Sequence, residues 1–431
     1  MAHTFESKAD EMTQAASDTL RETVHDPKWQ HIPLKALIET NKLIFIPGSA
    51  SVEEAFNTLA KNHLNSIPVE AVPGDMNCLT FDYNDLNSYL LLVLNKIQVN
   101  NQKVTEDCQN GKPVPVGEIV KLTPKNPFYK LSENDILTSA MRILGSGVHR
   151  VAICNPEMTF VKGILSQRRL VKYLWNNAKQ FASLESLFNY SLQDLQIGVL
   201  NSQYKVTSRQ SRVISIHGEE PLIMALYKMY TERISSIAVV DNQYNLLGNI
   251  SVADVKHVTR TSQYPLLHKT CRHFISVILN SRGLETGKDS FPVFHVYPTS
   301  SLGRTLAKLV ATKSHRLWIV QPPESLLSAQ STGNSMTNIS INSATTNLSN
   351  SPTNNITLPT ESQQLPQLTP TVSNSSNNNP SSPNLFEKEY RSGKLIGVIS
   401  LTDIISLFVR MATNNKEVDP QTARRQRGSI V

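Results

Sequence analysis

The chain has 431 residues, of which 39% are hydrophobic and 18% are charged, and its formal net charge is +7. This length allows two to four domains, and the composition is that of a water-soluble protein that also carries disordered sequence. We expect no membrane partner, because no apolar run approaches the roughly eighteen residues of a spanning helix, and no secretion signal in the polar residues 1–28. Four scattered cysteines without a CxxC pair predict reduced thiols of the cytoplasm and nucleus.

One pattern of about sixteen residues occurs four times along the chain. The blocks are residues 51–67, 135–151, 221–237 and 301–317. In each, mostly apolar side chains recur at i, i+3, i+4 and i+7, which predicts a helix of two to three turns with one apolar face. The stripes begin at Val52, Ile136, Leu222 and Leu302. A short strand follows each helix, and a repeat at this spacing indicates four copies of one module.

A second strand closes each module and leads into another apolar-periodic helix. The junctions are residues 79–85, 163–169, 248–254 and 397–403, and the last three begin with glycine and have serine at the fourth position, with mostly apolar residues between them. Their final residues are Asp85, Arg169, Asp254 and Asp403. The predicted module is therefore helix, strand, turn, strand, helix.

The fourth module contains a long insertion. Asp254 and Asp403 are 149 residues apart, whereas Arg169 and Asp254 are 85 apart. The excess is rich in Asn, Ser, Thr and Pro and has too few apolar residues to fold, so we expect a disordered loop over 322–385. Candidate phosphorylation sites are Ser351, Thr369 and Ser382, each followed by proline, and Ser429 in the C-terminal tail.

These patterns divide the chain into six predicted segments. They are a disordered tail (1–28), repeat one (29–99), repeat two (114–182), repeat three (183–265), repeat four (266–411) and a basic tail (412–431). The simplest interpretation of the basic tail is a solvated segment, and the alternatives are contact with an acidic partner or nucleic acid, or nuclear import. We expect no direct nucleic-acid binding, because the basic residues are not interleaved with exposed aromatic ones.

The module with its G-h-h-S-x-x-D junction resembles the CBS repeat, and the resemblance covers residues 29–411. It implies an α/β fold of the α+β type, in which four CBS repeats pair into two Bateman modules. Clefts between such repeats commonly bind adenine nucleotides. The resemblance therefore implies AMP, ADP or ATP as a ligand and no required cofactor.

The chain is also similar to the regulatory gamma subunits of AMP-activated kinase. In those subunits the ribose-binding acid is present in repeats one, three and four and is Arg in repeat two, which matches the four final residues given above. They also carry phosphate-binding His-Arg pairs in repeats two and four, here His149-Arg150 and His315-Arg316. Repeat one departs from the pattern, since Leu79, Asp82 and Asn65 replace the expected Gly, Ser and basic residue.

The candidate site residues have a structural interpretation beside the functional one. A carboxylate can accept hydrogen bonds from both ribose hydroxyls, and Arg and His can supply positive charge to phosphate. Asp254 and Asp403, with Ser251 and Ser400 as donors, suit the first role. The same Ser-x-x-Asp spacing also forms a helix capping box, and a cap alone explains Ser166 of repeat two. The His-Arg pairs can likewise be surface residues with ordinary partners.

The arrangement of tails, repeats and insertion resembles the fungal CBS-repeat proteins associated with DNA replication and cell separation, a family linked to inhibition of type 2A-like protein phosphatases. It implies a non-catalytic regulatory protein that binds and inhibits a type 2A-like phosphatase catalytic subunit during cell-cycle progression. The alternative is an adenine-nucleotide-sensing subunit like the kinase gamma subunit. We expect no enzyme, because the sequence has no Walker loop, G-x-S-x-G, H-E-x-x-H or kinase signature.

Overall fold

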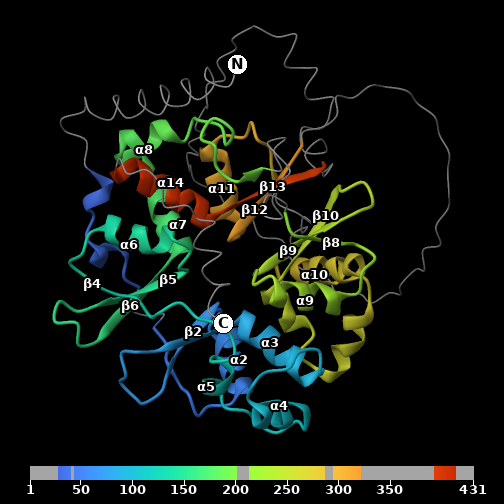
Figure 1. Ribbon diagram of the computed structural model, residues 1–431. Helices are drawn as coiled ribbons and strands as arrows, with labels where there is room; N and C mark the ends of the chain where they lie inside the picture. The colour runs from blue at the N-terminus through green and yellow to red at the C-terminus, as the bar shows by residue number, and fades with distance from the viewer. Residues whose placement is uncertain (1–27, 40–42, 201–212, 287–294, 322–392, 414–431) are drawn as a thin grey trace, which may run out of the picture. The chain divides into compact units, whose positions relative to one another are not determined.

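The structure is a computed structural model that describes residues 28–39, 43–200, 213–286, 295–321 and 393–413 (Figure 1). The described residues belong to one compact unit formed by residues 1–322 and 392–431. The predicted disordered tail, insertion and basic tail lie outside the described residues, except for residues 28, 412 and 413. Within the described part, no helix is long and apolar enough to cross a membrane.

Each repeat contains one small sheet with a common topology. A short first strand runs parallel to the central strand, which forms an antiparallel pair with the third strand. The strands are β1 (Ile46–Pro47), β2 (Ser66–Glu70) and β3 (Leu79–Asp82) in repeat one; β4 (Lys130–Ser132), β5 (Arg150–Cys154) and β6 (Val161–Ser166) in repeat two; β8 (Ser215–His217), β9 (Ser236–Val240) and β10 (Leu246–Ser251) in repeat three; and β11 (His295–Val296), β12 (Arg316–Val320) and β13 (Leu395–Ser400) in repeat four. In repeat four, β7 (Val199–Leu200) adds to β13.

The first helix of each module has the predicted apolar face in three of the four repeats. These helices are α2 (Val52–Lys61), α6 (Leu137–Gly145), α9 (Leu222–Thr231) and α11 (Leu302–Thr312). In repeat two the predicted apolar stripe, which begins at Ile136, is wrong by one residue. α6 begins at Leu137, so it starts one residue closer to the following strand β5 than the other first helices start to theirs. Its buried face is formed by Leu137, Ala140, Met141 and Leu144. Ile136 occupies the N-cap position, where its side chain forms no capping hydrogen bond, and is 38% exposed.

The second helix of each module follows its third strand directly. These helices are α3 (Tyr83–Val93), α7 (Gln167–Asn177), the 3₁₀ helix η5 (Val252–His257) and α14 (Leu401–Thr413). The residue before each helix is Asp82, Ser166, Ser251 or Ser400, and each side chain bonds within the first turn. Caps of this kind satisfy the free N–H groups of a helix start, which explains the polar residue at this point of the pattern.

Helices of different repeats pack together in pairs and form two separate cores. α3 of repeat one contacts η5 and α9 of repeat three, and one core contains apolar residues of both repeats. α14 of repeat four lies against α6 and α7 of repeat two, as Figure 1 shows, and a second core joins those repeats. A smaller apolar cluster joins the sheets of repeats three and four through Trp318. The four repeats therefore meet around a common centre.

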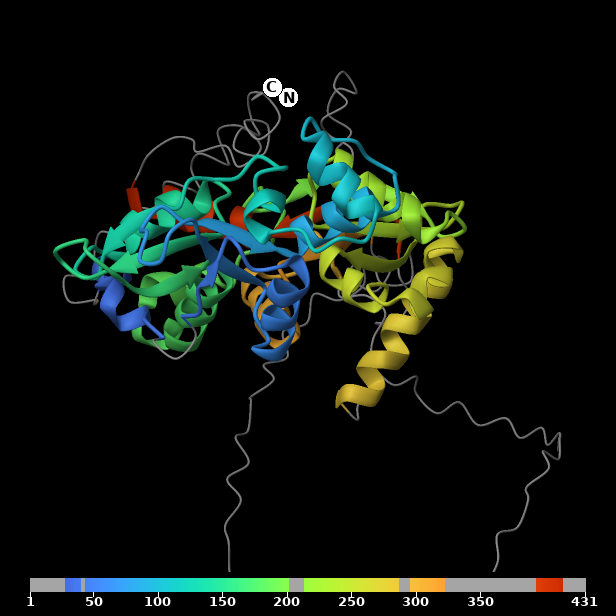
Figure 2. The ribbon, with the colours of Figure 1, turned by 90° about the horizontal axis from the view of Figure 1, so that it is seen from below.

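The segments between the repeats pack across the predicted boundaries. They are η1 (Trp29–His31), η2 (Leu34–Leu37), α4 (Gln102–Gln109), α5 (Val116–Ile119), η4 (Ala178–Gln180), α8 (Ala182–Leu187), η6 (Thr261–His268) and α10 (Cys271–Thr286). η1 and η2 join the core of repeats two and four, although they lie within the predicted bounds of repeat one. α5 packs against α2, and α10 packs against β10 before it extends beyond repeat three (Figure 2). The four cysteines are free and buried, as predicted.

The glycine of the junction pattern allows a close approach by a neighbouring segment. A Cβ atom at Gly248 would overlap the side chain of Ile275 on α10. We expect Gly248→Ala to lower the free energy of unfolding by about 1–3 kcal/mol, because overpacking forces the backbone or the isoleucine to move. Urea unfolding measures the change. Adding Ile275→Val should recover part of it, and equal stability of the native protein and Gly248→Ala would contradict the packing described.

Candidate functional site

A cavity of about 980 Å³ lies where loops of all four repeats meet. Its walls are formed chiefly by the residues that precede the central strands, by the starts of α3 and α7, and by the connection 122–128 between repeats one and two. This volume is in the range of small-molecule sites in proteins. The cavity is thus the candidate functional site.

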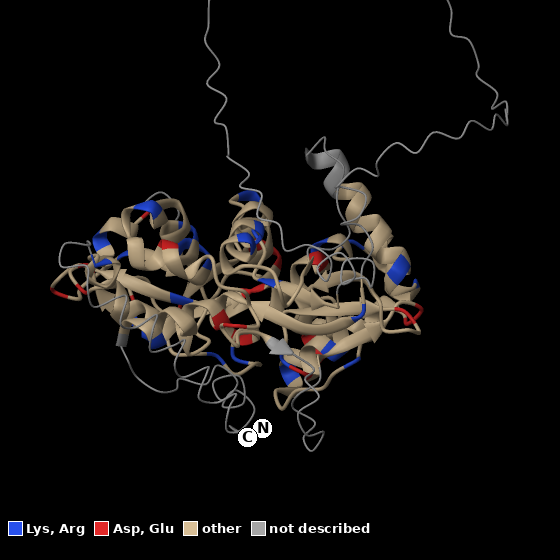
Figure 3. Cartoon of the chain, turned by 90° about the horizontal axis from the view of Figure 1, so that it is seen from above, with Lys and Arg blue, Asp and Glu red and all other residues tan. Residues whose placement is uncertain are grey.

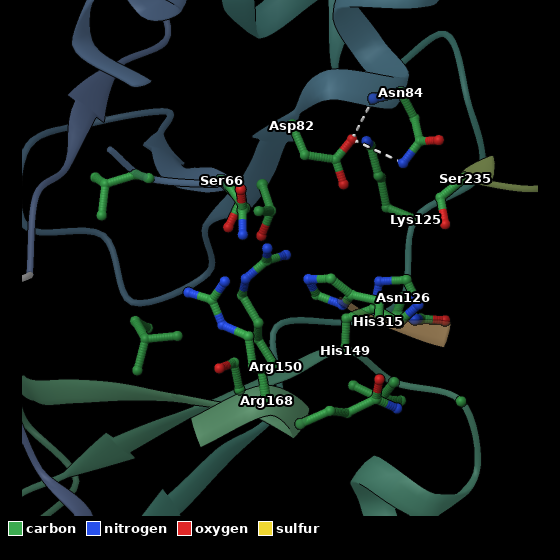
Figure 4. Close-up of a pocket in the computed structure, with 18 of the residues that line it drawn as sticks. Ser66, Asp82, Asn84, Lys125, Asn126, His149, Arg150, Arg168, Ser235 and His315 are labelled. Carbon is green, nitrogen blue, oxygen red and sulfur yellow. Dashed lines mark hydrogen bonds between the residues drawn. The ribbon is translucent and has the colours of Figure 1, made fainter. Parts of the chain in front are cut away.

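Among the basic side chains of repeats two and four that line this cavity, five lie at or beside the starts of β5, α7 and β12, and we call these five the basic cluster. They are His149, Arg150, Arg168, His315 and Arg316. Figure 4 shows His149, Arg150, Arg168 and His315 extending into the same space, with Asp82, Asn84 and Lys125 opposite. Lys and Arg also occur on many outer elements, with Asp and Glu among them (Figure 3), so the basic cluster is distinguished by the convergence of its side chains on one cavity, not by its charge alone.

The strand starts of repeats two and four place the two predicted His-Arg pairs. Arg150 begins β5 and Arg316 begins β12, and the histidine of each pair precedes its strand. Arg316 donates from Nη2 to Ser235 Oγ at 2.9 Å, which links repeat four to repeat three. The structure therefore brings together two pairs that are far apart in the sequence.

The cluster holds like charges close together. No hydrogen bond or ion pair engages the guanidinium of Arg150 or Arg168 within the described residues, although the charge of Asp82 acts on Arg150. Burial lowers the pKa of both guanidinium groups, and Arg168 lowers that of Arg150 further. Arginine remains charged at neutral pH despite such shifts. The unliganded cavity therefore contains positive charge that an anion would neutralise.

The pKa of His315 is affected by the positive charges of the basic cluster. Its side chain lines the cavity and keeps accessible surface there, while burial and the charges of Arg150, Arg168 and Arg316 lower its pKa from 6.5 to about 4. The imidazole is therefore neutral near pH 7, and each of its nitrogens can donate or accept one hydrogen bond. Because the unfolded chain takes up this proton at a higher pH than the folded protein does, the contribution of His315 to stability declines as the pH falls from 6.5 towards 4.

We expect the imidazole of His315 to titrate near pH 4 in the unliganded protein and at a higher pH when an anion occupies the cavity. Bound negative charge stabilises the imidazolium form. NMR of the histidine ring carbons measures the midpoint, and His315→Gln identifies the signal. A midpoint near 6.5 without ligand would show that the guanidinium charges do not act on this histidine.

Repeat one has an internal ion pair where the resemblance implies a ribose-binding acid. Asp85 is fully buried and does not line the cavity. Lys125 Nζ lies 2.5 and 2.7 Å from its two carboxylate oxygens, and Thr123 Oγ1 donates to Oδ1 at 3.2 Å. Asp85 Oδ2 also accepts from the backbone N–H of Asp82 at 2.8 Å. The carboxylate therefore already has partners within the chain.

Asp82 is the carboxylate of repeat one that faces the cavity. It caps α3, and its Oδ1 accepts from the backbone N–H of Asn84 at 2.8 Å. Burial raises the pKa of Asp82, but the charges of Lys125, Arg150 and His149 outweigh burial and leave it below its ordinary value. Asp82 thus places a negative charge opposite the basic cluster, whereas Glu39, which also lines the cavity, pairs with Arg169.

Asp254 and Asp403 form the helix caps that the sequence allowed as their structural interpretation. Asp254 Oδ2 accepts from Ser251 N and Oγ, each at 2.8 Å. Asp403 Oδ2 accepts from Ser400 N at 2.7 Å and from Ser400 Oγ at 2.6 Å. Both acids are buried, and neither they nor Ser251 line the cavity, whereas Ser400 does.

Repeat two presents a cation that sequence reasoning missed. The predicted Arg169 lines the cavity, but it donates to the carbonyl of Leu37 and forms an ion pair with Glu39. Its neighbour Arg168 extends into the cavity instead, as a member of the basic cluster (Figure 4). Successive helical residues point about 100° apart, so the helical phase set by the Ser166 cap was the available signal. The four predicted phosphorylation sites lie outside the described residues.

Comparison with known proteins places this fold and cavity in one class. A CBS domain family matches residues 206–260. A crystal structure of protein MJ1225 from Methanocaldococcus jannaschii, described as a candidate archaeal homologue of g-AMPK, superposes with a TM-score of 0.53 at 12% identity and covers 88% of this chain and 100% of that one. The chain therefore has the mixed α/β fold of CBS-repeat proteins, of the kind found in this archaeal structure.

Sequence comparison gives the family within that class. The chain is 70% identical over 447 residues to Protein SDS24 of Saccharomyces cerevisiae, covering 99% of this chain and 84% of the relative. It is 63% identical over 441 residues to Protein SDS23 of the same yeast, covering 95% and 84%. The chain belongs to this SDS23/SDS24 family of fungal proteins.

Proposed function

We propose that this chain is a non-catalytic regulatory protein whose central cavity binds an adenine nucleotide through its phosphates. The observation that carries the proposal is the pair of guanidinium groups, Arg150 and Arg168, that face the cavity without a hydrogen-bonding or ion-pair partner in the described part of the chain. A guanidinium matches phosphate oxygens in a bidentate arrangement, and such charge-assisted bonds are about twice as strong as neutral ones.

The rest of the cavity fits a phosphorylated nucleoside. Neutral His315 can donate a hydrogen bond to a phosphate oxygen without adding charge. Asp82 can accept from hydroxyl groups, while Asp85, Asp254 and Asp403 are occupied by the contacts described above. Hydroxyl recognition by Asp82 therefore replaces, in this proposal, the role that the resemblance assigned to those three acids.

Calorimetric titration of the full chain with AMP, ADP and ATP tests nucleotide binding. The proposal predicts binding that weakens with added salt, because charge provides much of the interaction. Arg150→Met should remove most of the heat. No heat and no thermal shift with any of the three nucleotides would leave a protein-interaction scaffold instead.

We further propose that the protein binds and inhibits a type 2A-like Ser/Thr phosphatase in the cytoplasm and nucleus, with roles in cell-cycle progression, DNA replication and cell separation. Support comes from the family resemblance stated in the sequence analysis, and four binding modules without a catalytic motif suit such a role. Pull-down of the catalytic subunit with measured phosphatase activity tests it. Unchanged activity in the presence of the purified chain would remove the inhibitory role.

The alternative is a nucleotide-sensing subunit of a kinase-like complex. The enclosed cavity favours it, because nucleotide occupancy would then be the main function of the fold. Phosphatase inhibition measured with and without saturating nucleotide separates the two roles. Inhibition that changes with nucleotide supports a regulated inhibitor, whereas nucleotide binding without any inhibition supports the sensing subunit.

A further inference from the structure

The turn before the central strand has the same backbone conformation in all four repeats. The residue three positions before the strand has a positive φ angle in each case: 51° at His63, 100° at Gly147, 52° at Arg233 and 54° at Lys313. The four residues all line the cavity. The fold therefore directs one equivalent turn of each repeat at the same space.

Three of these turns carry a basic side chain where glycine is the favoured residue. The left-handed conformation is strained for residues with a Cβ, and helix ends of this type usually have Gly or Asn. Repeat two has Gly147, so the turn itself does not require a side chain. Basic residues kept at strained positions around one cavity indicate a role for their charges.

Arg233 and Lys313 lie immediately beside the basic cluster. Arg233 is two residues from Ser235, whose hydroxyl accepts from Arg316, and Lys313 is two residues from His315. Two extended residues span only about 7 Å. Both side chains are exposed, and neither has a hydrogen bond or ion pair in the described part of the chain. They form a pair of free cations at the edge of the cavity, which we call the rim pair.

The basic cluster and the rim pair together carry more positive charge than one phosphate group can neutralise. Arg169 and Glu39 of the cavity wall pair with each other, and Arg150, Arg168 and Arg316 oppose the carboxylate of Asp82, which leaves about the charge that one phosphate monoester neutralises. The rim pair adds two further positive charges, and Lys172, one turn beyond Arg168 on α7, also lines the cavity. A monophosphate cannot neutralise all of these groups, whereas a chain of phosphoryl groups can.

We propose that the rim pair binds the outer phosphoryl groups of a polyphosphorylated ligand, so that the cavity favours a triphosphate over a monophosphate. The inference rests on the proposed binding of phosphate by the basic cluster and deepens it. The first phosphoryl group occupies the cluster, and the following ones extend to Arg233 and Lys313. A nucleoside triphosphate and an inorganic polyphosphate share this chemistry.

The test compares the full chain with the double variant Arg233→Gly/Lys313→Gly. Glycine relieves the left-handed strain, so the variant should unfold at an equal or higher temperature, and its folding is thereby verified. Calorimetry with magnesium-free ATP, AMP and tripolyphosphate should show at least about tenfold weaker binding of both triphosphates, which is about 1.4 kcal/mol, and AMP binding within about twofold. Met158→Gly is the matched control, because Met158 has a φ of 57° and does not line the cavity.

The outcomes separate this inference from the proposed function. Weaker binding of ATP and tripolyphosphate together supports the shared phosphate chemistry, and weaker binding of ATP alone supports a nucleotide as the source. Equal loss for AMP and ATP, or no loss for either, overturns the role of the rim pair while nucleotide binding stands. Binding of tripolyphosphate that depends on the rim pair, without any binding of AMP or ATP, supports the inference and removes the adenine nucleotide.

Discussion

Arg168→Met is expected to weaken binding of the cavity ligand about tenfold to a hundredfold, which corresponds to ~1.5–3 kcal/mol. Hydrogen bonds to charged groups contribute free energies of this size. Arg168 faces the basic cluster, and no partner engages its guanidinium within the described residues. Its loss therefore removes a ligand contact without breaking a contact of the folded chain. Calorimetric titration with ATP measures the effect.

The same variant should not destabilise the unliganded protein. Arg150, Arg168 and Arg316 each act on His315, so removing one charge reduces repulsion among the rest. The His315 titration should move to higher pH for the same reason. Arg142→Met is the control, because Arg142 is exposed on α6 and does not line the cavity. Equal losses of affinity in both variants would mean that net charge, and not the cluster, attracts the ligand.

Lys125→Met is expected to lower the free energy of unfolding by about 3–5 kcal/mol. Without the lysine, the buried Asp85 must either keep an uncompensated charge or take up a proton at neutral pH, and both cost free energy. Asp85 is fully buried, and the side chain of Lys125 is only 17% exposed. The carboxylates of Asp82 and Asp85 overcome the effect of burial and raise the pKa of Lys125, so the ammonium is charged in the native protein. Urea unfolding gives the difference.

The pH dependence of the stability of Lys125→Met gives a second test of the buried ion pair. Burial raises the pKa of Asp85 to about 7 even beside Lys125, so without the lysine the folded protein holds this carboxyl in its protonated form at neutral pH. The unfolded chain releases that proton near pH 4. The stability of Lys125→Met should therefore fall as the pH rises from about 4 through neutrality, more steeply than that of the native protein.

Two further variants distinguish the loss of the buried Lys125–Asp85 ion pair from a general effect of removing a lysine. Adding Asp85→Asn to Lys125→Met removes the uncompensated acid and should restore much of the stability. Lys121→Met breaks the exposed ion pair between Lys121 and Glu118. An exposed ion pair of this kind contributes about 0–1 kcal/mol to the free energy of unfolding. A similar loss in Lys121→Met and Lys125→Met would contradict the importance assigned to the buried pair.

The repeated units and their caps could be predicted from local patterns. The spacing of apolar residues determined the helix faces in repeats one, three and four, and Ser251 and Ser400 cap as their spacing indicated. The shared position of the two His-Arg pairs followed from the repeat itself, since equivalent strand starts meet in this fold. These features depend on residues that are close in sequence or occupy equivalent positions.

The rest of the site depends on contacts that no local pattern encodes. Lys125 reaches Asp85 from a connection without a motif, and one helical step decides whether Arg168 or Arg169 faces the basic cluster. The start of α6, one residue nearer its strand, shifted the predicted stripe of repeat two. Each of these depends on how segments distant in sequence fit together in space.

A crystal structure of the full chain grown with ATP is the sharpest test of phosphate binding by the basic cluster. We expect phosphate oxygens within hydrogen-bonding distance of the guanidinium groups of Arg150, Arg168 and Arg316 in the central cavity. A bound nucleotide whose phosphates contact none of these three residues would contradict it.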